Sequence, residues 1–268
     1  MLVYEVVVVG PALVVKHVET SELLRRAYEF LEQDEEVQAL IKMSNVMAVS
    51  RLRYNDHGVV HSRIVSGSAL ELFNILVEAG LKPSTIAYGT ARNLDEAKLV
   101  VLIAAYLHDI GNSVHRANHE YVGALLAKDI VDRMFREITP NLSSAYRYML
   151  RHEIMHAIYA TETNTRALTL EAGVVKVADG TDMAEGRARI PYKMGKLDMH
   201  SVSAISIKKV EIIKGVESAA RIEVYMNDSA GLFQIEAVLK PKILTSGFEK
   251  HFEVYTNVDG KELRVYPD

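Results

Sequence analysis

The chain has 268 residues, of which 49% are hydrophobic and 25% are charged, a composition typical of globular proteins. Its formal net charge of −4 gives no general attraction for nucleic acid or anionic membranes, so neither is expected as a partner. The chain contains no cysteine, which excludes disulfides, thiolate zinc sites, iron–sulfur clusters and cysteine nucleophiles. Any metal must therefore be held by His, Asp or Glu.

The N-terminal segment is apolar and predicts a β-strand. Residues 3–10, VYEVVVVG, are rich in β-branched side chains and are followed by Pro11. Residues 1–15 are too short to span a bilayer, and no basic region precedes them as in a signal peptide. We therefore expect a cytoplasmic protein whose first strand joins a sheet formed by a later part of the chain.

Helical patterns begin at Thr20 and Ser21. The first is charged and amphipathic, runs to about residue 43 and is typical of the outer helix of a bundle. A polar turn at residues 55–58 then leads into a second helix, which ends at Gly80 and carries His61 on its apolar face. A histidine in that position is more often a core residue than a metal ligand.

The next helix begins near Asp95 and ends on the adjacent residues His108 and Asp109. Its apolar residues cover nearly the whole circumference, which predicts a buried helix. An imidazole and a carboxylate at the inner end of such a helix need partners, because a buried charge must be paired or coordinate a metal. Taken alone, the dipeptide could equally be a core histidine whose hydrogen bonds are satisfied, followed by an aspartate that caps the turn at Gly111.

Three more helices are predicted at residues 117–138, 142–160 and 165–178. The first carries His119 near its start, and the third ends on Asp179. The second carries His152 and His156, which are four residues apart and therefore share a face. Five predicted helices thus bring His or Asp to a plausible common centre.

After Asp182 the sequence no longer shows the long helical patterns of the preceding residues. Residues 185–196 are basic and rich in turn residues, which predicts a linker or a flap. Strand patterns and a helix then follow in β-β-α-β order, which indicates a small α+β unit that the N-terminal strand could complete. The predicted fold is a mainly α-helical bundle with a smaller C-terminal α+β domain. The predicted segments are residues 1–18 (strand), 19–184 (helical domain), 185–202 (linker or flap) and 203–268 (α+β domain).

Six candidate metal ligands emerge from these helices: His61, His108, Asp109, His119, His152 and Asp179. All are nitrogen or oxygen donors, which suits Mn, Fe, Zn, Mg, Ni or Co. The alternative is that these residues are core polar groups without a metal. In that case Asp109→Ala would lower stability but change no metal content.

The order of these residues resembles the HD-domain superfamily of metal-dependent phosphohydrolases, over residues 45–183. The residues that carry the resemblance are His61 in VHSRIV, His108–Asp109 in LHDIGN and Asp179 in VVKVADGTDM, which match the ligand tetrad of the superfamily. His119 in NHEYVGALLA and His152 in RHEIMHAI match two further histidines of members that hold two metals. The tail, residues 190–258, is similar to an extension found in some prokaryotic members.

The resemblance implies an HD-domain helical bundle that hydrolyses a phosphomonoester or a phosphodiester by attack of a metal-bound hydroxide. The expected substrate is nucleotide-like. Asp109 would bridge two metals, with His119 and His152 on the second. The alternative is a regulatory protein that senses a nucleotide or metal without turnover. Members that cut cyclic dinucleotides usually carry Lys after HDIG and a GYP motif. This chain has Asn112 and no GYP, which argues against that activity.

Further residues near the motifs are candidates for the chemistry. Arg63, Arg116 and Lys176 could bind the substrate phosphate, and Arg116 is favoured, although each could simply be a surface charge. His156 could bind metal, contact phosphate or act as a general acid together with the catalytic Asp109.

Other polar residues are assigned supporting roles or none. Asp182 and Glu153 could orient ligand imidazoles, or could cap helix ends. His57 and His115 each lie in a turn with a better-placed histidine four residues later, so neither is expected to be a ligand. Because exposed sheet edges favour pairing, we also expect a homodimer.

Overall fold

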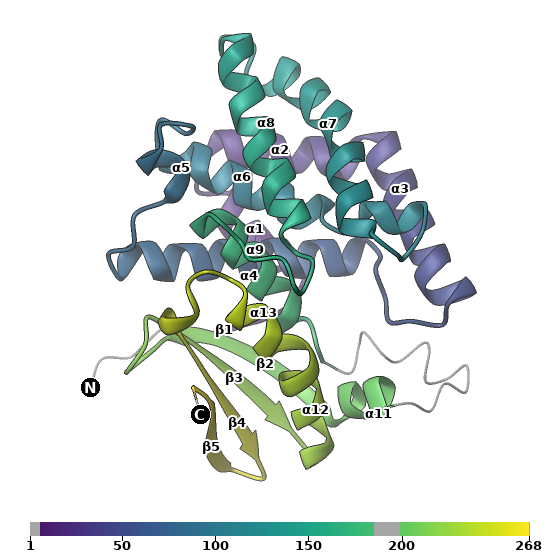
Figure 1. Ribbon diagram of the computed structural model, residues 1–268, viewed down its shortest axis with the longest axis vertical. Coiled ribbons are helices and arrows are strands. Elements are labelled where there is room, and N and C mark those ends of the chain that lie inside the picture. Colours follow the sequence, from purple (N-terminus) through teal and green to yellow (C-terminus); the bar gives the residue numbers. More distant parts are fainter. Residues whose placement is uncertain (1–5, 185–198, 268) are drawn as a thin grey trace.

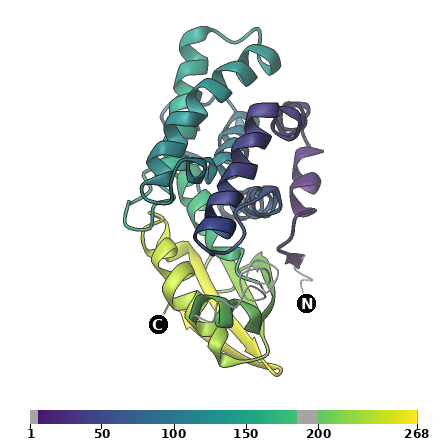
Figure 2. The same cartoon turned by 90° about the vertical axis from the view of Figure 1, so that its right-hand side faces the viewer.

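The computed structural model describes residues 6–184 and 199–267 (Figure 1). A helical unit occupies the upper part of the view, and a sheet with short helices lies below it. Figure 2 shows the same two parts stacked along the long axis of the molecule. No helix in these two ranges is long and apolar enough to cross a membrane.

The helical unit contains the predicted helices and some that were not predicted. Its elements are α1 (Leu13–Val18), α2 (Glu22–Gln33), α3 (Glu35–Asn45), the π-helical η1 (Val46–Arg51), α4 (Val59–Glu78), α5 (Ser84–Ala87), α6 (Leu94–Leu107), the 3-10 turn η2 (Ile110–Ser113), α7 (His119–Ile138), α8 (Ser144–Tyr159) and α9 (Leu170–Thr181). The single helix expected over residues 20–43 is wrong. The chain is extended at Asp34, whose side chain accepts a hydrogen bond from the Val37 amide and so starts a new helix there.

Helix α6 is the centre of the helical unit, as its apolar sequence predicts. The Asn93 side chain accepts a hydrogen bond from the Glu96 amide at the start of the helix. Residues 99–112 are all buried, and α6 packs against α2, α4, α8 and α9. Its C-terminal end therefore places His108 and Asp109 inside the molecule.

The sheet contains β1 (Val7–Val8), β2 (Ile207–Lys214), β3 (Ala220–Met226), β4 (Phe252–Val258) and β5 (Lys261–Tyr266), in that spatial order. All neighbouring pairs are antiparallel except β3 and β4, which are parallel. The predicted pairing of the N-terminal strand with the C-terminal unit is confirmed, through β1 and β2. Its described part is shorter than expected, and residues 1–5 lie outside the described ranges.

Short helical segments connect the parallel strands β3 and β4. They are η3 (Ser229–Gly231), α12 (Leu232–Gln234), the π-helical η4 (Ile235–Leu239), α13 (Lys240–Leu244) and η5 (Glu249–His251). The sequence predicted one helix over residues 230–246 and no strand β5. The expected linker at residues 185–202 lies mostly outside the described ranges, and α11 (Met199–Ser206) covers its end.

The C-terminal unit packs directly on α9, the helix that ends near Asp179. Segments η4 and α13 contact α9, and α4 contacts β2 and β3. Two glycines of α9 allow this close approach. A Cβ atom on Gly173 would lie 2.5 Å from the Ser246 carbonyl oxygen, and one on Gly180 would lie 3.0 Å from a Leu239 methyl. The crossover segments are thereby held beside the end of α9.

Candidate metal centre

Four of the predicted ligands meet at one point inside the helical unit. His61 comes from α4, His108 and Asp109 follow α6, and Asp179 lies in the last turn of α9. Nε2 of His61 lies 3.2 Å from Nε2 of His108, 3.3 Å from Oδ2 of Asp109 and 3.2 Å from Oδ1 of Asp179. Nε2 of His108 lies 3.5 Å from each of those two carboxylate oxygens.

These spacings suit a divalent metal. A zinc-like ion with bonds of about 2.1 Å holds tetrahedral ligand atoms about 3.4 Å apart. Five of the six separations among the four residues, 3.2 Å to 3.5 Å, match that value. The ligand atoms of His61, His108 and Asp179 all lie within 4.8 Å of one another. Two imidazole nitrogens and two carboxylate oxygens are also donors that such ions accept. The residues present therefore fit a metal ion.

Hydrogen bonds on the far side of each ring turn the two ligand imidazoles toward this point. Nδ1 of His61 donates to Oδ2 of Asp182 at 2.7 Å, and Nδ1 of His108 donates to the Ala105 carbonyl at 2.8 Å. Either bond leaves the Nε2 lone pair facing the cluster, as metal-binding histidines require. The structure supports the predicted orienting role of Asp182 but not that of Glu153, which accepts a hydrogen bond from Thr90.

Both carboxylates of the cluster are kept ionised. Burial alone would raise the pKa of Asp109, but His57 and His108 outweigh it and hold that pKa well below its usual value. Burial would likewise raise the pKa of Asp179, and Lys242 together with His108 holds it well below the usual value. Anionic carboxylates are the form that binds metal.

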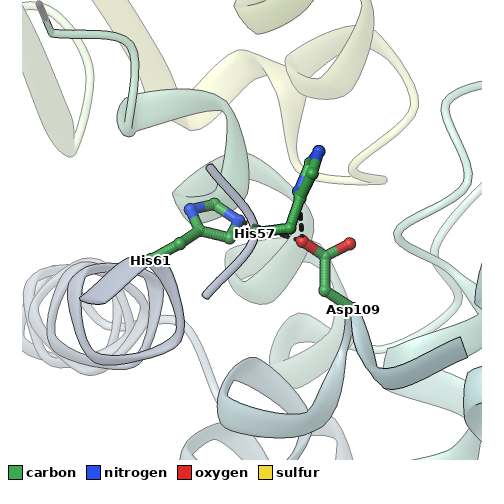
Figure 3. Close-up of side chains that lie close together, drawn as sticks. All are labelled: His57, His61 and Asp109. Atoms are coloured by element: carbon green, nitrogen blue, oxygen red, sulfur yellow. Dashed lines mark hydrogen bonds and ion pairs between the residues drawn. The ribbon is translucent and has the colours of Figure 1, made fainter. Parts of the chain in front are cut away.

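His57, which was not expected to be a ligand, belongs to the cluster. Its Nδ1 lies 2.7 Å from Oδ2 of Asp109 (Figure 3), and the residue is buried. His57, His61 and Asp109 form a second group whose ligand atoms all lie within 4.8 Å of one another. The turn is folded over the cluster because the His57 amide donates to the Asn45 side chain at 3.1 Å. The four-residue spacing from His61 was the available sequence signal.

His119 lies on the other side of Asp109, as predicted. Its Nε2 is 3.3 Å from Oδ1 of Asp109 and 3.0 Å from an Nη atom of Arg116. Burial would lower the pKa of His119, but Asp109 and Glu120 outweigh it and raise the pKa to about 9. Arg116 also donates to Asn112, which itself donates to Oδ1 of Asp109 at 2.9 Å. Both carboxylate oxygens of Asp109 therefore have polar partners, His57 and His61 at Oδ2 and His119 and Asn112 at Oδ1.

Gly111 allows His119 to reach this position. A Cβ atom built on Gly111 would lie 1.9 Å from the His119 carbonyl oxygen and 2.5 Å from the Gly123 amide nitrogen. No side chain fits in that space. The glycine of the HDIG sequence is thus the point at which η2 and the start of α7 touch.

The structure does not bring His152 and His156 to the cluster. Nδ1 of His152 donates to the Tyr148 carbonyl at 2.7 Å, and Nε2 of His156 accepts from the Leu168 amide at 3.3 Å. Both line a separate surface pocket with Thr90, Tyr148, Met149 and Glu153. They do share a face of α8, as predicted, but the buried face is a different one, which carries Leu150, Ile154, Ala157 and Ile158.

Two of the predicted phosphate-binding residues are engaged elsewhere. Arg63 donates to both carboxylate oxygens of Glu32, and Lys176 donates to the carbonyls of Thr163 and Thr165. His115 is exposed, and its Nδ1 accepts a hydrogen bond from the Ala117 amide, so its exclusion from the ligands stays a prediction. Of the three cations considered, only Arg116 faces the cluster.

A pocket of about 600 Å³ opens onto the cluster. The helical unit contributes Tyr54, Asn55, His57, Asp109, Arg116, His119, Glu120, Thr161, Thr163 and Asp179, and the C-terminal unit contributes Gln234, Ala237, Val238 and Lys242. Nζ of Lys242 lies 2.8 Å from Oδ2 of Asp179 and donates to the Thr161 carbonyl at 3.1 Å. Lys242 was not predicted, because no motif in the sequence marks it.

The comparisons with known proteins agree with this geometry. The HD domain family matches residues 74–184, a range that includes every member of the cluster except His57 and His61. The chain is 43% identical over 241 residues to the uncharacterized protein MJ1020 of Methanocaldococcus jannaschii, a match that covers 90% of this chain and 91% of that protein. No solved structure matches the chain significantly. The chain belongs to the HD-domain superfamily.

Proposed function

We propose that this protein is a metal-dependent phosphohydrolase that cleaves a phosphomonoester or a phosphodiester. The observation that carries the proposal is the arrangement of His61, His108, Asp109 and Asp179 within the cluster. Ligand atoms of these four residues lie 3.2 Å to 3.5 Å apart, the spacing of a metal's coordination shell, and Asp109 and Asp179 line an open pocket. A structural metal site would be closed, whereas a catalytic one keeps a position accessible to substrate.

His61, His108, Asp109 and Asp179 would hold one metal, and His57 and His119 lie where they could help Asp109 hold a second. When bound, the metal would neutralise phosphate oxygens and lower the pKa of water. The remaining contributions come from side chains. Asp182 keeps His61 in the ligating tautomer, and Arg116, fixed by Asn112, offers a guanidinium to a phosphate oxygen.

The pocket supports a substrate of nucleotide size. Its volume of about 600 Å³ falls within the range of roughly 300–1,000 Å³ that small-molecule sites occupy. Tyr54, Asn55 and Gln234 offer aromatic and hydrogen-bonding groups, and Ala237 and Val238 offer an apolar wall. Such a mixture suits a base or sugar attached to the phosphate.

The first test is metal content together with hydrolysis. The purified parent, Asp109→Ala and His152→Ala would each be loaded with Mn²⁺, dialysed and analysed by mass spectrometry. We expect about one or two metals per chain in the parent and in His152→Ala, and almost none in Asp109→Ala. The same samples would be screened with p-nitrophenyl phosphate, bis-p-nitrophenyl phosphate and nucleotides. A metal-free parent, or a loaded parent that releases no product from any ester, would contradict the proposal.

We also propose that the protein forms a homodimer. Among the strands of residues 6–184 and 199–267, β1 and β5 are the two edges of the sheet. Unpaired strand edges are surfaces on which another chain can add. Val6 and Val8 beside the first edge are 54% and 52% exposed. Light scattering at micromolar concentration tests the proposal, and a monomer would refute it.

A further inference from the structure

Lys242 is a buried cation of the C-terminal unit that lines the pocket. It lies on α13 and is 7% exposed. Its ammonium is fixed by two contacts with the helical unit, 2.8 Å to Oδ2 of Asp179 and 3.1 Å to the Thr161 carbonyl. The other oxygen of Asp179 faces His61 and His108, so Lys242 reaches the carboxylate from the side away from the cluster.

These two contacts leave part of the ammonium available. A lysine ammonium has three N–H donors. Two of them are used by Asp179 and Thr161, and within residues 6–184 and 199–267 no third acceptor contacts Nζ. A buried N–H without an acceptor is unfavourable, so a ligand that supplies one would gain a charge-assisted hydrogen bond.

The charges around the pocket indicate what such a ligand is. The pocket walls carry three carboxylates, from Asp109, Glu120 and Asp179, which by themselves would repel an anion. Among the described lining residues, the permanent cations are Arg116 and Lys242. A phosphate that approaches the cluster would therefore gain favourable contacts from these side chains, in addition to those with a bound metal.

The packing of α13 on α9 leaves room for the side chain of Lys242 beside Gly180. Gly180 directly follows Asp179, and a Cβ atom at Gly180 would lie 3.3 Å from Cδ of Lys242 and 3.0 Å from a Leu239 methyl. The absence of a side chain at Gly180 thus gives the aliphatic part of Lys242 its path past α9. The C-terminal unit and the metal-ligand helix fit together at this point.

We propose that Lys242 binds an oxygen of the substrate phosphate through its third N–H, so that the C-terminal unit supplies part of the substrate site. The inference rests on the proposed function for its substrate class. Asp179 and the Thr161 carbonyl act as the fixed supports that hold the ammonium in place. Lys242 would thereby share the phosphate with Arg116, one cation coming from each unit of the chain.

The test uses inorganic phosphate as the probe and the full-length, Mn²⁺-loaded protein. Isothermal titration calorimetry would compare the parent with Lys242→Met, Lys242→Gln and Lys242→Arg. Lys240→Met is the matched control, because Lys240 lies on the same helix but pairs with Glu236 outside the pocket. Circular dichroism would establish folding, and mass spectrometry would give the metal content of each protein.

We expect the Kd for phosphate to rise by about tenfold to a hundredfold in Lys242→Met and Lys242→Gln, since a hydrogen bond to a charged group is lost. Lys242→Arg should recover part of the affinity, and Lys240→Met should match the parent. The metal content should remain that of the parent in all folded variants. Lys242→Gln, which keeps a donor for Asp179, provides the test if Lys242→Met does not fold.

Two results would overturn the inference. One is an unchanged Kd for phosphate in folded Lys242→Gln. The other is loss of metal in that variant in proportion to the loss of phosphate binding, which would make Lys242 only a support for Asp179. A parent that binds phosphate through Lys242 yet hydrolyses no ester would refute the proposed function while leaving this inference intact.

Discussion

Oδ2 of Asp182 accepts a hydrogen bond from Nδ1 of His61 at 2.7 Å, although the two residues are 121 positions apart in the chain. Asp182 caps the C-terminal end of α9, and His61 lies in the first turn of α4. The same end of α9 therefore supplies both a cluster carboxylate, Asp179, and the group that orients a cluster imidazole. This hydrogen bond joins α4 to α9 beside the cluster, to which the end of α6 adds His108 and Asp109.

Asp182→Ala should weaken metal binding without removing a ligand. Without Asp182, the His61 ring is free to rotate or to adopt the other tautomer, and loss of such a partner typically costs about 10- to 100-fold in metal affinity. Titration of the metal-free protein with Mn²⁺ measures the effect, and Asp182→Asn should be intermediate. Equal affinities in Asp182→Ala and the parent would show that the hydrogen bond has no orienting role.

His57→Ala should lower metal content or affinity, whereas His152→Ala should change neither. The reason is that His57 contacts Asp109 at 2.7 Å, while His152 bonds to Tyr148 in a separate pocket. Mass spectrometry after loading with Mn²⁺ and dialysis distinguishes the two variants. The opposite pattern would restore the original expectation that His152, and not His57, is a ligand.

Gly111→Ala should destabilise the protein severely. The added methyl would lie 1.9 Å from a backbone oxygen, and backbone atoms cannot move aside as a side chain can. We expect a loss of about 3 kcal/mol or more in the free energy of unfolding, at the upper end of overpacking effects. Urea unfolding measures it, with Gly10→Ala as the control because no atom lies within 4 Å of the added methyl. Equal losses in both variants would argue against the close approach.

The stability of the metal-free protein should rise at alkaline pH because of Lys176. Burial, with a smaller contribution from Lys242, lowers the pKa of Lys176 from 10.5 to about 8. Between these values the unfolded chain binds more protons than the folded one, so the free energy of unfolding increases with pH. The loss of stability caused by burying the charged Lys176 ammonium is fully present below pH 8. It is relieved as the pH rises towards 10.5.

Urea unfolding in EDTA at pH 7.5 and pH 10 would compare the parent with Lys176→Met. The parent should gain on the order of 2 kcal/mol more than the variant over this interval. Other lysines and tyrosines titrate in both proteins, so only the difference between them reports on Lys176. Parallel pH curves for the two proteins would contradict the prediction.

The sequence by itself determined the helical core and four members of the cluster. A run that is apolar on every face, as in α6, can only be buried, so the residues that end it must lie inside the protein. The extended break at Asp34 was not predicted, because local helix propensity continues across the residue whose side chain caps the next helix. Strand β5 was not predicted either, because it is a short edge strand that depends on its pairing with β4.

Only the tertiary structure decided which polar residues surround the cluster. Helical periodicity shows that His152 and His156 share a face, but not which neighbour that face meets. His57 enters through a turn held by Asn45, and Lys242 arrives from another unit across the packing of α13 on Gly180. Such placements depend on contacts between distant segments, and the sequence pattern of one segment carries no information about its partner.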